Sequence, residues 1–104
     1  MQKTLYTRQY QLLLELLKDF RKQAVVTQAQ LAERLQVPQS EVSKCESGSR
    51  RLDLIELKLW VEAMGGSAGA FLQVFDERVQ ADVVTGGGDE ARQLLRARPP
   101  RLVK

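Results

Sequence analysis

Apolar residues recur at helical spacing along most of the chain and predict an all-α fold. Residues 5–22 form the first predicted helix, because apolar residues there lie three, four or seven positions apart. Its apolar face consists of Leu5, Leu12, Leu13, Leu16, Leu17 and Phe20. A later helix is predicted between a cap at Asp53 and a stop at Gly65-Gly66. The apolar face of that helix consists of Leu54, Leu57, Trp60, Val61 and Met64.

Between these two helices, residues 27–46 predict two short helices joined by a turn. Thr27 and Gln30 have the spacing of a capping box at the start of the first one. Pro38 fits the start of the second, since a proline in the first turn gives up only an N–H that has no helical partner. Gly48 then predicts its end.

The second of these short helices is poor in apolar residues. Val42 and Cys45 give it a single inward stripe, and we interpret Cys45 as a small buried hydrophobe in preference to a redox switch. A helix with so little apolar area is suited to presenting hydrogen-bonding side chains to a partner outside the domain. The major groove of DNA fits that use.

A fifth helix is predicted after a cap at Ser67, with Phe71, Leu72, Val74 and Phe75 as its apolar residues. Two interpretations remain for its far end: the helix extends towards residue 83, or residues 79–83 alternate as a strand. We predict one domain over residues 1–80 and a flexible, glycine-containing basic tail over residues 81–104. The fold expected overall is a compact bundle of five helices.

The segment TQAQLAERLQVPQSEVSKCE, continued through SGSRRLDLIEL, resembles the helix-turn-helix of the Xre family, the class of the lambdoid phage repressors and Cro proteins. The matching residues are Gln28, Ala32, Val37, Gln39, Ser40, Val42, Ser43, Lys44, Glu46, Gly48, Arg51, Leu52 and Asp53. The resemblance runs from about Tyr10 to Phe75 and implies a DNA-binding domain like that of lambda repressor. The sequence departs from the family at Gln36, a turn position where the family usually has Gly. A left-handed conformation there would cost about 1 kcal/mol.

The resemblance also implies which residues contact DNA. Gln39 is expected to read a base, and a bidentate contact with adenine is worth about 1–3 kcal/mol of discrimination. Gln28 is expected to hold a phosphate at a helix N-terminus. Ser40 and Ser43 are small enough for close approach, and Lys44 can reach a phosphate or a guanine edge. The alternative is that these are solvated helix positions.

Two arginines lie in the loop after the second short helix, and in the family this loop contacts the phosphates of the DNA backbone. Arg50 and Arg51 are therefore expected to bind phosphates, although Arg51 could instead pair with Glu46. Glu41 is left outside the predicted site, because phosphates repel an acid facing DNA unless it accepts a hydrogen bond from cytosine. Arg21, on the first helix, is interpreted as part of a solvated face.

The family dimerises through its last helices, which implies a homodimer. The residues expected at the contact are Trp60, Met64, Phe71, Val74 and Phe75.

Charge and composition agree with a small DNA-binding protein. Residues 1–51 hold nine Lys/Arg and five Asp/Glu, whereas residues 52–85 hold two and six. The half with the predicted helix-turn-helix is thus the basic one. The 104 residues contain no His and one Cys, so no metal site, cofactor or enzyme is predicted. A single Cys suits the cytoplasm, and no apolar stretch or signal segment predicts a membrane.

Two functional hypotheses follow. The first is a sequence-specific transcriptional regulator, a repressor, that binds double-stranded DNA at a pseudo-palindromic operator as a dimer. The alternative is an antitoxin-type or bridging module whose tail folds on a protein partner through residues such as Leu94, Leu95 and Arg96.

Overall fold

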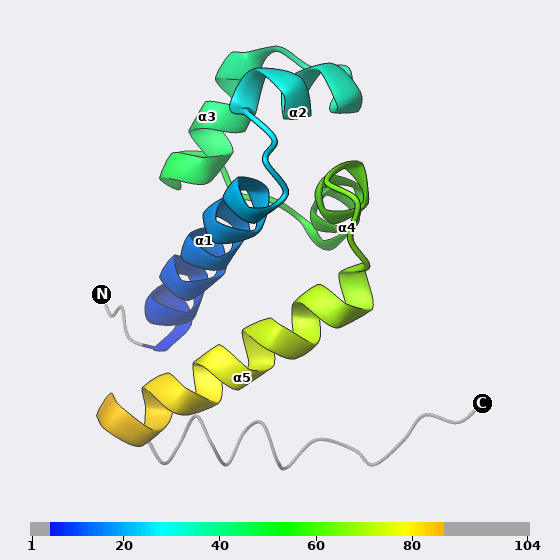
Figure 1. Ribbon diagram of the computed structural model, residues 1–104. Helices are drawn as coiled ribbons and strands as arrows, with labels where there is room; N and C mark the ends of the chain where they lie inside the picture. The colour runs from blue at the N-terminus through cyan, green and yellow to red at the C-terminus, as the bar shows by residue number, and fades with distance from the viewer. Residues whose placement is uncertain (1–4, 87–104) are drawn as a thin grey trace, which may run out of the picture.

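The computed structural model describes residues 5–86, and the side chains of residues 7–82. These residues form the five helices α1 Leu5–Gln23, α2 Gln28–Leu35, α3 Gln39–Ser47, α4 Leu54–Ala63 and α5 Ala68–Gly86 (Figure 1). No strand occurs in this part of the chain, so the predicted all-α, five-helix fold is confirmed. The pair α2 and α3 packs on α4 and on α1, while α5 packs along α1 and α4.

The local signals in the sequence set the helix ends as expected. Thr27 Oγ1 accepts a hydrogen bond from Gln30 N at 3.0 Å, and Gln30 Oε1 accepts one from Thr27 N at 2.9 Å. Asp53 and Glu56 form the same reciprocal capping box at the start of α4. Gly48, with φ of 89°, ends α3 in a left-handed conformation. These caps depend only on neighbours in the chain, which is why they were predictable.

Two non-glycine residues share that left-handed conformation. Gln36 has φ of 62° and ψ of 45°. It therefore adopts the left-handed conformation considered above for the turn position where the family usually has Gly. Val25, in the α1–α2 connection, has φ of 59° although its β-branched side chain is 84% exposed. No packing contact offsets the steric cost at such an exposed side chain, so Val25 carries backbone strain.

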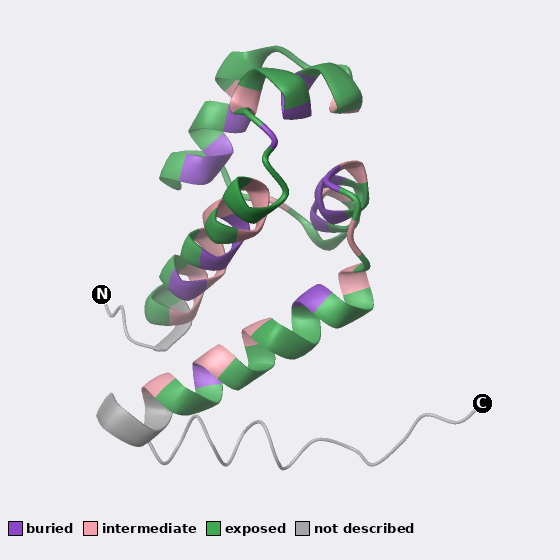
Figure 2. Ribbon diagram, viewed as in Figure 1, coloured by how far each residue is buried: buried purple, intermediate pink, exposed green. Residues whose placement is uncertain are grey.

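The core lies where the five helices meet, and most buried positions face it from α1, α4 and the pair α2 and α3 (Figure 2). Its residues are Leu16, Leu17, Val26, Leu31, Ala32, Val42, Cys45, Leu57, Trp60, Val61, Met64 and Phe71. Phe20 packs edge-on against Phe71, with ring centroids 5.6 Å apart.

This core includes three residues that the sequence placed at a dimer contact. Trp60, Met64 and Phe71 are only 6%, 6% and 2% exposed, because α4 and α5 pack on each other and on the rest of the chain. They are covered within one chain and leave little area for a second copy. Val74 remains exposed and Phe75 is partly buried. The prediction that Trp60, Met64 and Phe71 form the dimer contact is therefore revised, because these three side chains belong to the core of a single chain.

The fifth helix continues past its predicted end. Phe75 and Val79 lie four residues apart on the face towards the core, and α5 runs on to Gly86, so residues 79–83 are helical. Ion pairs of Arg8 with Asp82 and of Arg78 with Asp19 join α5 to α1. The predicted boundary after residue 80 thus lies inside a helix. The predictions for the tail beyond residue 86 lie outside the described residues. None of the described helices is long and apolar enough to cross a membrane.

Candidate nucleic-acid interface

Helix α3 is divided lengthwise into a buried row and an exposed row. Val42, Cys45 and Glu46 face the core, and Cys45 is buried as expected. On the other side the exposed residues are Gln39, Ser40, Ser43 and Lys44. The predicted contact residues of α3 therefore share one solvent-facing surface, available to a partner.

A buried ion pair fixes the inner side of α3. Arg21 Nε lies 2.6 Å from Glu46 Oε2, and Arg21 Nη2 lies 3.0 Å from Glu46 Oε1. Arg21 Nη1 also donates to the carbonyl of Val26 at 2.9 Å. The interpretation of Arg21 as a solvated residue is wrong, because its guanidinium is held between α1, α3 and the chain entering α2. Glu46 pairs with Arg21 and not with Arg51.

A chain of side-chain amides leads from this ion pair to the surface. Gln28 Nε2 donates to Glu46 Oε1 at 3.0 Å, and Gln39 Nε2 donates to Gln28 Oε1 at 3.5 Å. Because a carboxylate only accepts hydrogen bonds, Glu46 determines which way the Gln28 amide faces. The two glutamines singled out by the sequence are thus brought together, and the buried pair orients both.

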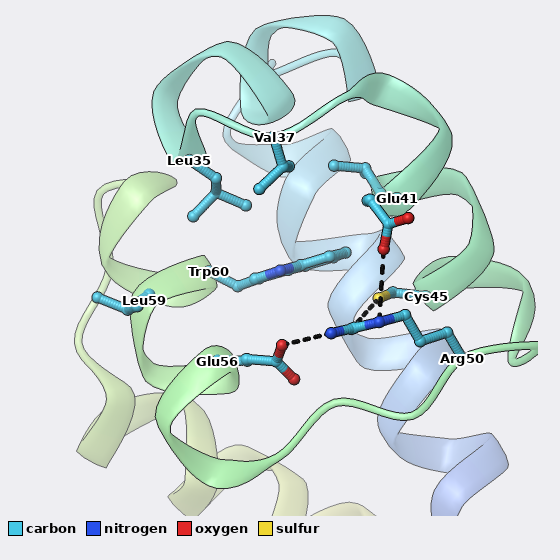
Figure 3. A pocket seen from close by; sticks show the side chains of 9 residues that line it. Leu35, Val37, Glu41, Cys45, Arg50, Glu56, Leu59 and Trp60 are labelled. Carbon is cyan, nitrogen blue, oxygen red and sulfur yellow. Dashed lines mark hydrogen bonds and ion pairs between the residues drawn. The ribbon is translucent and has the colours of Figure 1, made fainter.

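Arg50 lies in an ionic cluster between α3 and α4. Its Nη2 is 2.6 Å from Glu56 Oε2, and its Nε is 3.4 Å from Glu41 Oε1. Its Nη1 donates to Cys45 Sγ at 3.2 Å (Figure 3). Hydrogen bonding to Glu56 raises the pKa of Arg50, and the same contact lowers the pKa of Glu56. Lys44 Nζ lies 3.9 Å from the other oxygen of Glu41.

Tyr10 holds the loop that follows α3, and the sequence analysis assigned it no role. Leu52 N donates to the Tyr10 hydroxyl at 3.1 Å, and the Arg51 guanidinium carbon lies 4.3 Å from the centre of the Tyr10 ring. Arg51 is exposed and close to the end of α3. Only the tertiary fold brings Tyr10 to this loop, so no local signal could have identified it.

A cavity of about 230 Å³ lies behind α3, between the α2–α3 turn and α4 (Figure 3). Its lining residues are Leu35, Val37, Glu41, Val42, Cys45, Arg50, Glu56, Leu59 and Trp60. The charged groups lie at one end and the aliphatic and indole groups at the other. Beside it, α4 exposes Leu54, Ile55 and Leu59. No cluster of acidic or Cys residues in the described part of the chain could hold a metal ion.

Comparisons with known proteins agree with this arrangement. The helix-turn-helix family matches residues 17–71, from the second half of α1 to the start of α5. A solved structure titled "XRE-family like protein from Pseudomonas syringae pv. tomato str. DC3000" is 41% identical to the chain, with a TM-score of 0.70. The match covers 72% of this chain and 92% of that one. No curated protein matches the chain.

Proposed function

The chain belongs to the Xre-type helix-turn-helix family of DNA-binding transcription regulators, and from this premise we propose that it is a repressor that binds a pseudo-palindromic operator as a homodimer. The observation that carries the proposal is the lengthwise division of α3. One row anchors the helix in the core, and the other presents only polar and basic side chains. A helix of this kind fits the major groove, whose base edges offer hydrogen-bond donors and acceptors.

In this proposal the two linked glutamines have different tasks. Gln39, in the first turn of α3, reads a base edge, and Gln28, in the first turn of α2, binds a phosphate. Their 3.5 Å contact and the bond from Gln28 to Glu46 support these roles, because both amides are oriented before DNA arrives. Ser40 and Ser43 permit close approach, and Lys44 supplies a positive charge.

The proposed dimer is supported by the small number of base pairs that one α3 can contact. A single recognition helix contacts few base pairs, whereas two related by a twofold axis read half-sites about 34 Å apart. The apolar residues most exposed on the described surface of α4 are Leu54 and Ile55, at 66% and 64%, and we place the contact with the second copy there. Val74 on α5 stays the alternative from the predicted set.

Selection of bound duplexes from a random pool tests the proposed function. The wild-type protein is expected to enrich one sequence with twofold symmetry and half-sites about one helical turn apart. A pool that stays random after repeated rounds, with all duplexes bound equally, would contradict sequence-specific binding.

A further inference from the structure

Arg50 joins two carboxylates that come from different helices. Glu41 belongs to the first turn of α3, and Glu56 to the first turn of α4. The Arg50 Nη2–Glu56 Oε2 distance is 2.6 Å, and the Arg50 Nε–Glu41 Oε1 distance is 3.4 Å (Figure 3). The proposed function leaves this bridge unexplained.

The donors of Arg50 are largely occupied by the protein itself. A guanidinium has five N–H groups in one plane. Nη1 of Arg50 faces Cys45 Sγ at 3.2 Å and the carbonyl of Arg51 at 3.4 Å, Nη2 faces Glu56, and Nε faces Glu41. Four contacts thus use most of the fork, and its plane is set by two helices. One N–H remains, and 41% of the side chain is accessible, but a bidentate phosphate contact would have to displace one of these carboxylates.

Glu41 is the residue on α3 that most needs such a partner. It lies on the same helix as the exposed row of Ser40, Ser43 and Lys44, and 37% of its side chain is accessible. An uncompensated carboxylate there would repel the phosphates that a recognition helix approaches. In the structure its side chain turns towards the cavity beside Trp60, where Arg50 meets it.

We propose that Arg50 is a positioning residue that neutralises Glu41 and fixes the end of α3 against α4, and that it does not bind a phosphate. This inference rests on the proposed function, since it concerns how α3 comes to DNA. The two neighbouring arginines then differ in their contacts and not in their exposure. Arg51 lies over the Tyr10 ring, whereas Arg50, with 41% of its side chain accessible, is tied to carboxylates of both α3 and α4.

A double-mutant cycle on the selected duplex tests the inference, with affinities measured at several salt concentrations. Arg50→Gln is expected to weaken binding about tenfold, because Glu41 then keeps only the longer, 3.9 Å contact with Lys44 as it approaches the phosphates. In the Glu41→Gln background the same substitution should cost less than about twofold, since no charge is left to neutralise. The salt dependence of the double variant should match that of the wild type.

Arg51→Gln is the matched control. As a phosphate contact, Arg51 should lose the same affinity in both backgrounds, with a decrease of about 0.9 in the slope of log affinity against log salt. If Arg50→Gln behaved in the same way as Arg51→Gln, the inference would be overturned while the proposed function stood. If the wild type bound all duplexes equally, both would fall.

Glu56→Gln provides a second test that leaves Arg50 in place. Glutamine can keep the cap on Asp53, as Gln30 does for Thr27, so the variant removes the charge and preserves the helix start. Loosening Arg50 from α4 is expected to weaken operator binding two- to threefold. Unchanged or tighter binding, which a released phosphate ligand would produce, would contradict the positioning role.

Discussion

Arg21 and Glu46 form a two-pronged ion pair that joins α1 to α3, with 12% and 4% of their side chains exposed. Because Glu46 also accepts from Gln28, this pair supports the amides that lead to the surface of α3.

Replacing Arg21 alone should lower the free energy of unfolding far more than replacing Arg21 and Glu46 together. Arg21→Met leaves the Glu46 carboxylate buried without a countercharge, which costs about 3–5 kcal/mol of the free energy of unfolding. Urea denaturation of the variant measures this loss. The double variant Arg21→Met/Glu46→Leu should recover most of it, since two apolar side chains need no countercharge. Equal stability of Arg21→Met and the wild type would show that the pair is not buried as described.

Replacing the strained Val25 should stabilise the protein. Val25→Gly removes the clash of a β-branched side chain at φ of 59°, a gain of about 1 kcal/mol in the free energy of unfolding. Val74→Gly is the matched control, because Val74 is also exposed but lies inside α5. There the same substitution should destabilise by about 0.5–1 kcal/mol. Thermal or urea unfolding of both variants checks the opposite signs.

Most of the fold could be predicted from the sequence, because the signals were local. Capping boxes at Thr27 and Asp53 and the stop at Gly48 involve residues a few positions apart, and helical spacing marks apolar faces directly. Which surface covers an apolar side chain, in contrast, depends on residues far away in the sequence or in another chain. The pattern identified Trp60 and Phe71 as apolar, but only packing decides whether the same chain or a second copy covers them.

The candidate site was predicted less completely for the same reason. Gln28 and Gln39 stand out because each begins a short helix. Arg21 lies twenty-five positions before Glu46, and nothing in its surroundings along the chain distinguishes it from a solvated arginine. Tyr10 and Leu52, forty-two positions apart, meet only once α1 packs beside the loop after α3.

Acid should weaken the contact between α1 and α5. Hydrogen bonding to Arg8 lowers the pKa of Asp82 below its ordinary 3.8, so this carboxylate binds protons more readily in the unfolded chain than in the folded one. Its contribution to stability is therefore complete above that value and is lost as the pH falls through the lowered pKa. Urea midpoints of the wild type and Asp82→Asn, measured from neutral pH downwards, should converge at acid pH. A constant difference between the two proteins would contradict the ion pair.

Charge on the exposed face of α4 should dissociate the dimer. Ile55→Glu places a carboxylate in the proposed contact and is expected to give a monomer in light scattering at micromolar concentration, with weaker operator binding. Val74→Glu is the matched variant on α5 and should stay dimeric. A monomeric Val74→Glu would move the contact to α5. A wild-type protein that is monomeric both free and on DNA would refute the homodimer.

The central claim, that α3 reads bases through Gln39, is tested most directly by the sequence preference of Gln39→Ala. Each base pair of the selected operator is changed in turn, and the affinities of the variant and the wild type are compared. The account predicts that the variant loses about 1–3 kcal/mol of discrimination at one base pair in each half-site and keeps its preference elsewhere. Gln73→Ala, an exposed glutamine on α5, should leave all preferences unchanged. A uniform loss of affinity by Gln39→Ala, with every base preference intact, would contradict direct readout.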